Sequence, residues 1–254
     1  MMRRATDALC VFQIHLARLR AEVGPYLLSA LVFPSVMYMF ANAVGGTDGA
    51  AALDPEHRVR FLAGSIVFSL SLTAVSWLGY LLLENRFTGR LKLFATLPLA
   101  PSSYVAGIVI FALAQAAIGT ASLFAIAALL GIRTALNGVL GLGSLTAVLV
   151  LTVLCVCGIA VIIAARARSF TEGSLLTDAL GAGLVFLAPV YCTPESLPRA
   201  LQIMSRALPT TYAARGVRAA LAGGSAGAGD LLTLAGMAVV TLAVGFHVMR
   251  WRED

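Results

Sequence analysis

Six long apolar segments constrain this sequence more than any other feature. A helix of about 20 residues, rising 1.5 Å per residue, crosses the hydrocarbon core of a bilayer, and each segment is close to that length or longer. Backbone polar groups in lipid must be paired within the segment, so such runs fold as helices. The sequence therefore predicts an all-α membrane protein. The expected spans lie near Pro25–Val44, Phe61–Leu83, Tyr104–Leu130, Gly138–Ala165, Ser174–Tyr191 and Leu231–Met249.

The composition favours the same class. Of the 254 residues, 59% are hydrophobic and 12% are charged, whereas about a quarter of the residues in a soluble domain are charged. The formal net charge is +6, but the arginines lie at the ends of apolar runs, which is typical of a membrane topology. We therefore expect the lipid bilayer as a partner and no nucleic acid.

Residues 1–24 predict an amphipathic helix that lies in the membrane interface, followed by a six-span domain over residues 25–254. Apolar residues recur at spacings of three and four, which places them on one helical face. A solvated helical tail is the alternative, and Gly24-Pro25 would turn the chain into the first span. The apolar positions are Leu9, Phe12, Leu16, Leu19 and Val23.

The basic residues predict the orientation of the spans. They are more frequent in the two tails and in the second and fourth loops than in the first and third loops, and basic residues concentrate on the cytoplasmic side. We therefore expect both termini to be cytoplasmic. The last loop, Cys192–Asp230, is an exception to this rule, because it carries four arginines and is expected outside.

That last loop predicts an external helical hairpin between the fifth and sixth spans, at about residues 194–222. Its two short helices would be Pro198–Leu208, opened by proline, and Thr210–Leu221, capped by Thr210 or Thr211. Because the first helix has an apolar face, we expect the hairpin at or partly within the outer leaflet. That face would hold Leu201, Met204 and Leu208.

No catalytic or cofactor-binding motif is present in the sequence. A phosphate-binding loop needs Gly-Lys followed by Ser or Thr, whereas the only lysine, Lys92, is followed by Leu93. The three histidines are far apart along the chain, and the four cysteines lack metal-ligand spacing. We expect a chain that is not an enzyme, with no catalytic residue, no metal and no cofactor of its own.

Asp178 is the only acidic residue well inside an expected span. A charge at mid-membrane costs about 3 kcal/mol and less near the interface. We expect Asp178 to reach the lipid headgroups, toward Arg166 or Arg168. A role in transport is the alternative.

A row of alanines in the third expected span predicts a helix-packing face, because small residues let helices approach closely in lipid. Polar residues of the second and third spans either hydrogen bond across helices or line a transport path, and the sequence leaves both readings open. The alanines are Ala114, Ala117, Ala121, Ala125 and Ala128, and the polar residues are Thr73, Ser76, Gln115 and Thr120.

A compact charged segment, LENRFTGRLKLFATLPLAPS, lies between the second and third spans. Asn85 or Thr88 is suited to start a short helix there, and Leu97-Pro98 is suited to end it. We expect an amphipathic helix over about residues 85–97 at the cytoplasmic face, in contact with the membrane or with a protein partner. Its apolar face would hold Phe87, Leu91 and Phe94, beside Arg86 and Arg90.

Three features, in this order, resemble the membrane subunit of ABC-2-type bacterial exporters, a family that includes the daunorubicin-resistance permeases. They are the amphipathic N-terminal helix, the E-x-R-x-x-G-R-L segment at Glu84–Leu91 closed by LPLAPSSY, and the stretch LPRALQIMSRALPTTYAARGVRAALAGG. The resemblance covers nearly the whole chain. It implies a multi-pass permease of the bacterial inner membrane, whose ATPase is a separate chain.

The resemblance also implies a set of partners and site residues. Two permease subunits, identical or paralogous, would pair around a path, and two ATPase subunits holding ATP and Mg²⁺ would drive it. The charged segment would be the coupling helix, with docking residues Phe87, Arg90, Leu91 and Phe94 and membrane-face anchors Glu84 and Arg86. The late stretch would be a re-entrant hairpin, with Pro209, Thr211, Tyr212 and Arg218 as its marked residues. The first, second and fifth spans would line the path, with Phe33, Met37, Tyr38, Thr73 and Ser76 as candidates.

The expected substrate is a small amphiphile of drug or antibiotic type, because the chain has no large added domain. Export of a lipid-linked or polysaccharide substrate would use the same architecture. A stand-alone secondary transporter and a non-transporting membrane scaffold are also compatible with the sequence.

Overall fold

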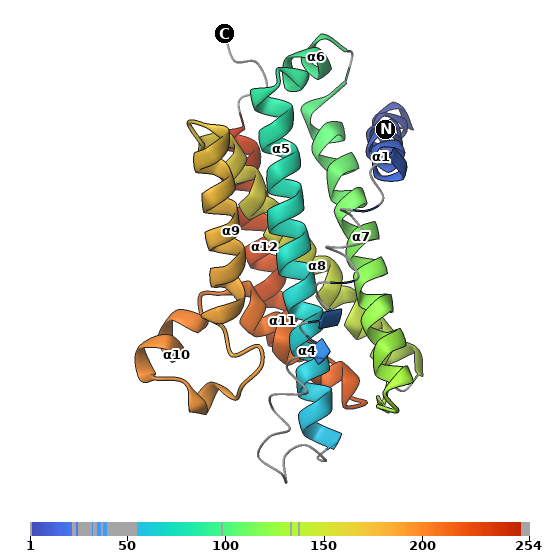
Figure 1. The fold of residues 1–254 in the computed structure, drawn as a ribbon, viewed down its shortest axis with the longest axis vertical. Coiled ribbons are helices and arrows are strands. Elements are labelled where there is room, and N and C mark those ends of the chain that lie inside the picture. The colour runs from blue at the N-terminus through green and yellow to red at the C-terminus, as the bar shows by residue number, and fades with distance from the viewer. Residues whose placement is uncertain are drawn as a thin grey trace.

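The computed structural model describes residues 2–21, 24, 32, 35–36, 38–39, 55–97, 99–132, 134–136 and 138–249, and the regular secondary structure in this part is helical throughout. Long helices lie side by side along the longest axis of the molecule (Figure 1). In chain order the elements are α1 (Met2–Ala21), α4 (Pro55–Leu72), the π-helix η3 (Thr73–Trp77), α5 (Leu78–Phe87), α6 (Arg90–Thr96), α7 (Pro101–Leu129), α8 (Gly138–Arg166), α9 (Phe170–Phe186), the 3₁₀-helix η4 (Pro194–Ser196), α10 (Arg199–Ser205), α11 (Pro209–Leu221) and α12 (Ala228–Val248).

Among the described residues, four helices are long and apolar enough to cross a membrane. They are the continuous helix Glu56–Phe87, which joins α4, η3 and α5, and the helices α7, α8 and α12. These agree with the second, third, fourth and sixth expected spans. The first expected span, Pro25–Val44, lies largely outside the described residues, and the fifth corresponds to α9, which has 17 residues. The total of six spans stays a prediction.

The helix Glu56–Phe87 forms the centre of the bundle. Of its most apolar window, 82% is buried inside the chain, against 17% for α12. Leu62, Ile66 and Leu70 are fully buried along it, where it meets α7, α8, α9 and α11. A helix that is apolar on all sides and covered by others is the expected core of a membrane bundle. The peripheral helix α12 packs mainly against α8.

The contact between α8 and α12 depends on a glycine. A Cβ atom at Gly158 would lie 2.5 Å from Thr241 Oγ1 and 2.6 Å from the Thr241 backbone. The Thr241 hydroxyl donates a hydrogen bond to the carbonyl oxygen of Cys155, at 3.1 Å. Small residues at a contact let two helix backbones approach closely in lipid.

Helix α9 begins earlier than the expected fifth span because the sequence caps it there. Ser169 Oγ accepts a hydrogen bond from the Glu172 backbone N–H at 3.1 Å, and Glu172 Oε2 accepts one from the Arg168 backbone N–H at 2.9 Å. The Ser169 hydroxyl therefore caps the start of α9, and the Glu172 carboxylate holds the backbone of the residue before the cap.

Helix α1 packs against α7 through Val11 and Phe12, so this contact uses only part of the predicted apolar face. Val11 is fully buried against Gly107 of α7, where a Cβ atom would lie 2.6 Å from the Val11 Cβ. Leu9, in contrast, is 52% exposed. Phe12 contacts the ring of Phe111 on α7, with centroids 6.4 Å apart. The predicted amphipathic helix therefore exists, and its position in the membrane interface stays a prediction.

The alanine row of α7 does not form the packing face inside this chain, so that prediction is wrong. Ala117, Ala121, Ala125 and Ala128 are exposed. The buried face lies one row away and uses the still smaller Gly119 together with apolar side chains. It holds Ala112, Ala116, Gly119, Leu123 and Ala127, and the side chains of Gln115 and Thr120 are buried as well.

The loop after α9 contains the two expected helices, and they differ in burial. Of the expected apolar face, Met204 is 52% exposed, whereas Leu201 and Leu208 are half-buried and Leu208 packs against the core. The position of this face in the outer leaflet stays a prediction. Helix α11 is largely buried and packs against α4, α8 and α12. Helices α10 and α11 lie toward one end of the molecule and α6 lies at the other, with α1 in the α6 half (Figure 1).

Candidate functional site

The turn that leaves the central helix is set by a glycine. Helix α5 continues to Phe87, and the Thr88 hydroxyl donates to the carbonyl oxygen of Glu84 at 2.6 Å. Gly89 then takes φ 77°, in the left-handed region that favours glycine after a helix end. Helix α6 begins only at Arg90. The predicted start at Asn85 or Thr88 is therefore wrong, because both belong to the end of α5.

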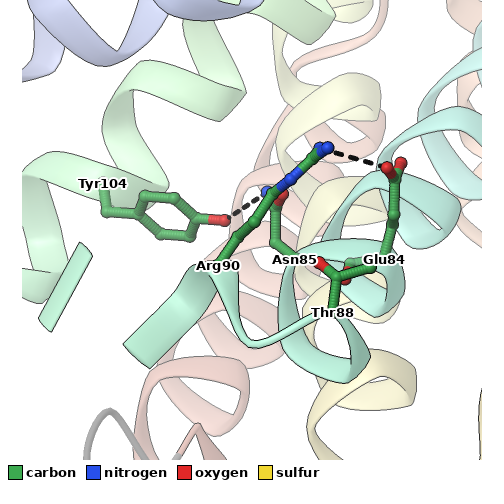
Figure 2. A network of polar contacts seen from close by, with 5 residues as sticks. All are labelled: Glu84, Asn85, Thr88, Arg90 and Tyr104. Atoms are coloured by element: carbon green, nitrogen blue, oxygen red, sulfur yellow. Dashed lines mark hydrogen bonds and ion pairs between the residues drawn. The ribbon is translucent and has the colours of Figure 1, made fainter. Parts of the chain in front are cut away.

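A network of polar contacts ties α6 to α5 and α5 to α7 (Figure 2). Arg90 Nη1 contacts Glu84 Oε1 at 3.1 Å, which ties the start of α6 to α5. Asn85 is 2% exposed, and its Nδ2 donates to the Tyr104 hydroxyl of α7 at 2.8 Å. A buried amide needs such a partner, so this bond fixes the spacing of α5 and α7 beside the turn.

Helix α6 has an inner and an outer face. Leu91 and Phe94 pack inward against the core, and the Phe94 ring lies 5.3 Å from that of Tyr104. Leu91 lines a cavity of about 30 Å³ between α5, α7 and α8. Outward, Leu93 is 66% exposed. The predicted single apolar face is therefore corrected: Phe87 belongs to α5 and is exposed, while Leu91 and Phe94 are directed into the protein.

Arg86 joins the end of α5 to the end of α8. Its Nη1 donates to the carbonyl oxygens of Ala164, Ala165 and Ala167 at 2.8, 3.1 and 2.9 Å. The last carbonyls of a helix have no partner within it, and a positive charge there is favourable for the helix dipole. Within this chain, Arg86 therefore caps α8.

Arg218 plays a similar part at the other end of the bundle. From α11 its Nη2 donates to the carbonyl oxygens of Pro189 and Val190 at 2.6 Å, and of Cys192 at 3.2 Å. Burial lowers the pKa of Arg218 from its ordinary value, and the charge of Arg60 lowers it further. Because the ordinary pKa of arginine is so high, the guanidinium stays charged. The contacts fix the turn that follows α9.

The other marked hairpin residues also form contacts within the chain. Pro209 occupies the first turn of α11. The sequence predicts Thr210 or Thr211 as the cap of α11, but neither side chain caps this helix. Thr210 instead donates to the Leu184 carbonyl oxygen and Thr211 to that of Ser205. The Tyr212 hydroxyl donates to the Arg206 carbonyl oxygen at 2.7 Å.

The expected path residues are described only in part. Phe33 and Met37 lie outside the described residues, and of Thr73 only the backbone, within η3, is described. Tyr38 is fully buried in the core of the chain. Ser76 is buried in η3, where its hydroxyl contacts Asp178.

The sequence predicts that Asp178 extends toward Arg166 or Arg168, and this prediction is wrong. Asp178 faces the central helix, where the Tyr80 hydroxyl donates to its Oδ2 at 2.6 Å and the Ser76 hydroxyl to its Oδ1 at 3.4 Å. The sequence reasoning missed Tyr80. A usable signal was present, because Ser76 and Tyr80 are four residues apart, which places two hydroxyl groups on one side of a helix.

A bundle of long apolar helices, with a short helix tied to one end by a polar network, defines a multi-pass α-helical membrane protein. The family model of the ABC-2 type transporter matches residues 12–222, and the chain belongs to this family. The matched domain is the membrane permease component of an ABC transporter, which associates with an ABC ATPase. The match includes the α5–α6 turn and the segment from α9 to α11. Comparison with curated proteins finds no match.

Proposed function

We propose that this chain forms the translocation path of an ATP-driven exporter for a small amphiphilic compound of drug or antibiotic type. It would lie in a bacterial inner membrane with both termini cytoplasmic. It would work with a second permease, identical or paralogous, and with two copies of an ATPase that holds ATP and Mg²⁺. The observation that carries the proposal is α6, a short helix with an exposed outer face that polar contacts tie to the spans.

The two faces of α6 have different roles in this proposal. The exposed residues Phe87, Leu93 and Leu97, with Arg90 beside them, form the surface on which the ATPase docks. The inner residues Leu91 and Phe94 carry the motion to Tyr104 of α7. Glu84 keeps α6 in place through Arg90, and Arg86 passes displacement of α5 to the end of α8.

The test is transport by the purified chain in proteoliposomes, with and without a co-expressed ABC ATPase subunit. We expect stable co-purification of the two chains and uptake into inverted vesicles only when both chains and ATP are present. Uptake by the permease alone, driven by a proton gradient, would show a secondary transporter instead. Offering a small amphiphile and a lipid-linked oligosaccharide in parallel separates the proposed cargo from its alternative.

A further inference from the structure

The carboxylate of Asp178 has an unusual position for a charged group. It lies eight residues into α9, or about 12 Å along the helix axis, and it is exposed at the surface of the chain. Its contacts are the hydroxyl groups of Tyr80 and Ser76. Among the described residues, no basic side chain forms an ion pair with it.

In the proposed topology α9 is the fifth span, and an exposed carboxylate halfway along that span does not suit a surface that faces lipid. An acidic group near the centre of a membrane helix costs about 2.5–3.5 kcal/mol. Two neutral hydroxyl donors lower that cost but leave the negative charge in place, because neither donor carries a compensating charge. The surface with Asp178 therefore fits a water-filled or ligand-filled space better than hydrocarbon.

The backbone opposite Asp178 departs from the regular α-helix. Residues Thr73–Trp77 form a π-helical turn within the central span, and Ser76 belongs to that turn. Single π-helical turns inside α-helices occur frequently at functional sites. The Ser76 hydroxyl donates to one carboxylate oxygen of Asp178, and the Tyr80 hydroxyl, four residues later, donates to the other.

The aromatic ring next to the carboxylate, that of Tyr80, is paired with a second ring. The Tyr80 ring, whose hydroxyl contacts Asp178, lies 6.3 Å from the ring of Phe170, measured between centroids. Phe170 is itself 42% exposed. The face of an aromatic ring attracts cations, quaternary ammonium groups included. A negative charge beside the Tyr80 ring, which is paired with that of Phe170, is a suitable site for a large organic cation.

We propose that Asp178, Tyr80 and Ser76 form the site at which the permease recognises the positive charge of its substrate, a protonated or quaternary amine or a similar lipophilic cation. The carboxylate supplies the opposite charge, the hydroxyl groups hold the carboxylate in position, and the rings of Tyr80 and Phe170 contact the apolar groups around the cation. This inference rests on the proposed function, since it assigns the substrate class of the transport path.

The test is equilibrium binding of tetraphenylphosphonium to the full-length chain in lipid nanodiscs, with empty nanodiscs to subtract partition into lipid. Tetraphenylborate, of similar size and opposite charge, is the matched probe. We expect saturable binding of the cation by the wild type, at least tenfold weaker binding by Asp178→Asn, and binding weaker by a few-fold for Tyr80→Phe. Asp178→Glu should retain most of the affinity. Asp230→Asn, which removes an equal charge from α12, should bind like the wild type.

Several results would overturn the inference. They are the absence of saturable cation binding by the wild type, equal affinity of Asp178→Asn and wild type, and an equal loss of tetraphenylborate binding. A change in oligomeric state by Asp178→Asn, without loss of cation affinity, would assign the carboxylate to subunit contact and would also overturn it. The measurement needs neither ATP nor ATPase. A failed ATPase complex would therefore contradict the proposed function alone, and a negative binding result would contradict this inference alone.

Discussion

At the scale of single residues, two arginines fasten parts of the backbone that would otherwise lack partners. Arg86 binds the last carbonyls of α8, and Arg218 binds the carbonyls of the turn after α9. Unpaired backbone groups are costly away from water, and a guanidinium has several donors in a fixed plane. Both arginines therefore stabilise the fold of the chain by pairing backbone carbonyl groups.

Replacing Arg86 by glutamine should lower the thermal unfolding midpoint of the purified chain in detergent. Three carbonyl oxygens would lose a charged donor, and a hydrogen bond to a charged group contributes about 1.5–3 kcal/mol. Arg86→Lys should recover part of the loss, because it keeps the charge. Arg90→Gln is the control, since its exposed ion pair contributes about 0–1 kcal/mol. Equal midpoints for Arg86→Gln and Arg90→Gln would contradict the capping role.

At the scale of elements, the sequence shows which segments are helical better than it shows which way they face. The apolar runs predicted four of the spanning helices, and the Leu97-Pro98 pair predicted where the short helix after the second span ends. The buried faces of α6 and α7 were predicted wrongly, and the position of α1 in the membrane interface stays a prediction. In a soluble protein the polar face marks the outside, but in lipid the outer face is apolar too, so periodicity alone does not separate core from surface.

Gly158→Ala should loosen the contact of α8 with α12. The added Cβ would meet the Thr241 side chain and backbone at 2.5 and 2.6 Å, and overpacking of this kind costs about 1–3 kcal/mol. Gly143→Ala on the same helix is the matched control, because a Cβ there meets nothing within 4 Å. Thermal unfolding should separate the two variants. If both behave like the wild type, the helices do not approach as closely as the structure shows.

Substitutions on the two faces of α6 should have different effects. Leu93→Asp changes an exposed side chain, so the stability of the permease should change by about 0.5 kcal/mol or less, while substrate-stimulated ATPase activity of the complex should be lost. Leu91→Asp would place a charge against the core and should lower the unfolding midpoint clearly. Full ATPase stimulation in a complex with Leu93→Asp would contradict docking by the outer face.

At the scale of the whole molecule, the candidate sites join segments that are distant in the sequence. Asp178 and Tyr80 are 98 residues apart, and Arg86 and Ala164 are 78 apart. The charged segment could be singled out from its composition, because it interrupts two apolar runs. The pairing of α9 with the central helix could not be predicted, because no fixed spacing relates separate spans of a bundle. The chain belongs to the ABC-2 type transporter family, and we propose that the Asp178 site takes part in transport.

The central claim is that the outer face of α6 is where the ATPase binds. It is tested most directly by photo-crosslinking with a benzoylphenylalanine at position 93, in membranes that contain both chains. Val139, which is 88% exposed at the start of α8, is the control position, because it lies at the opposite end of that helix from the carbonyls that Arg86 binds. We expect a crosslink to the ATPase from position 93 and none from position 139. No crosslink from position 93 in an intact, co-purifying complex, or equal crosslinking from both positions, would contradict the account.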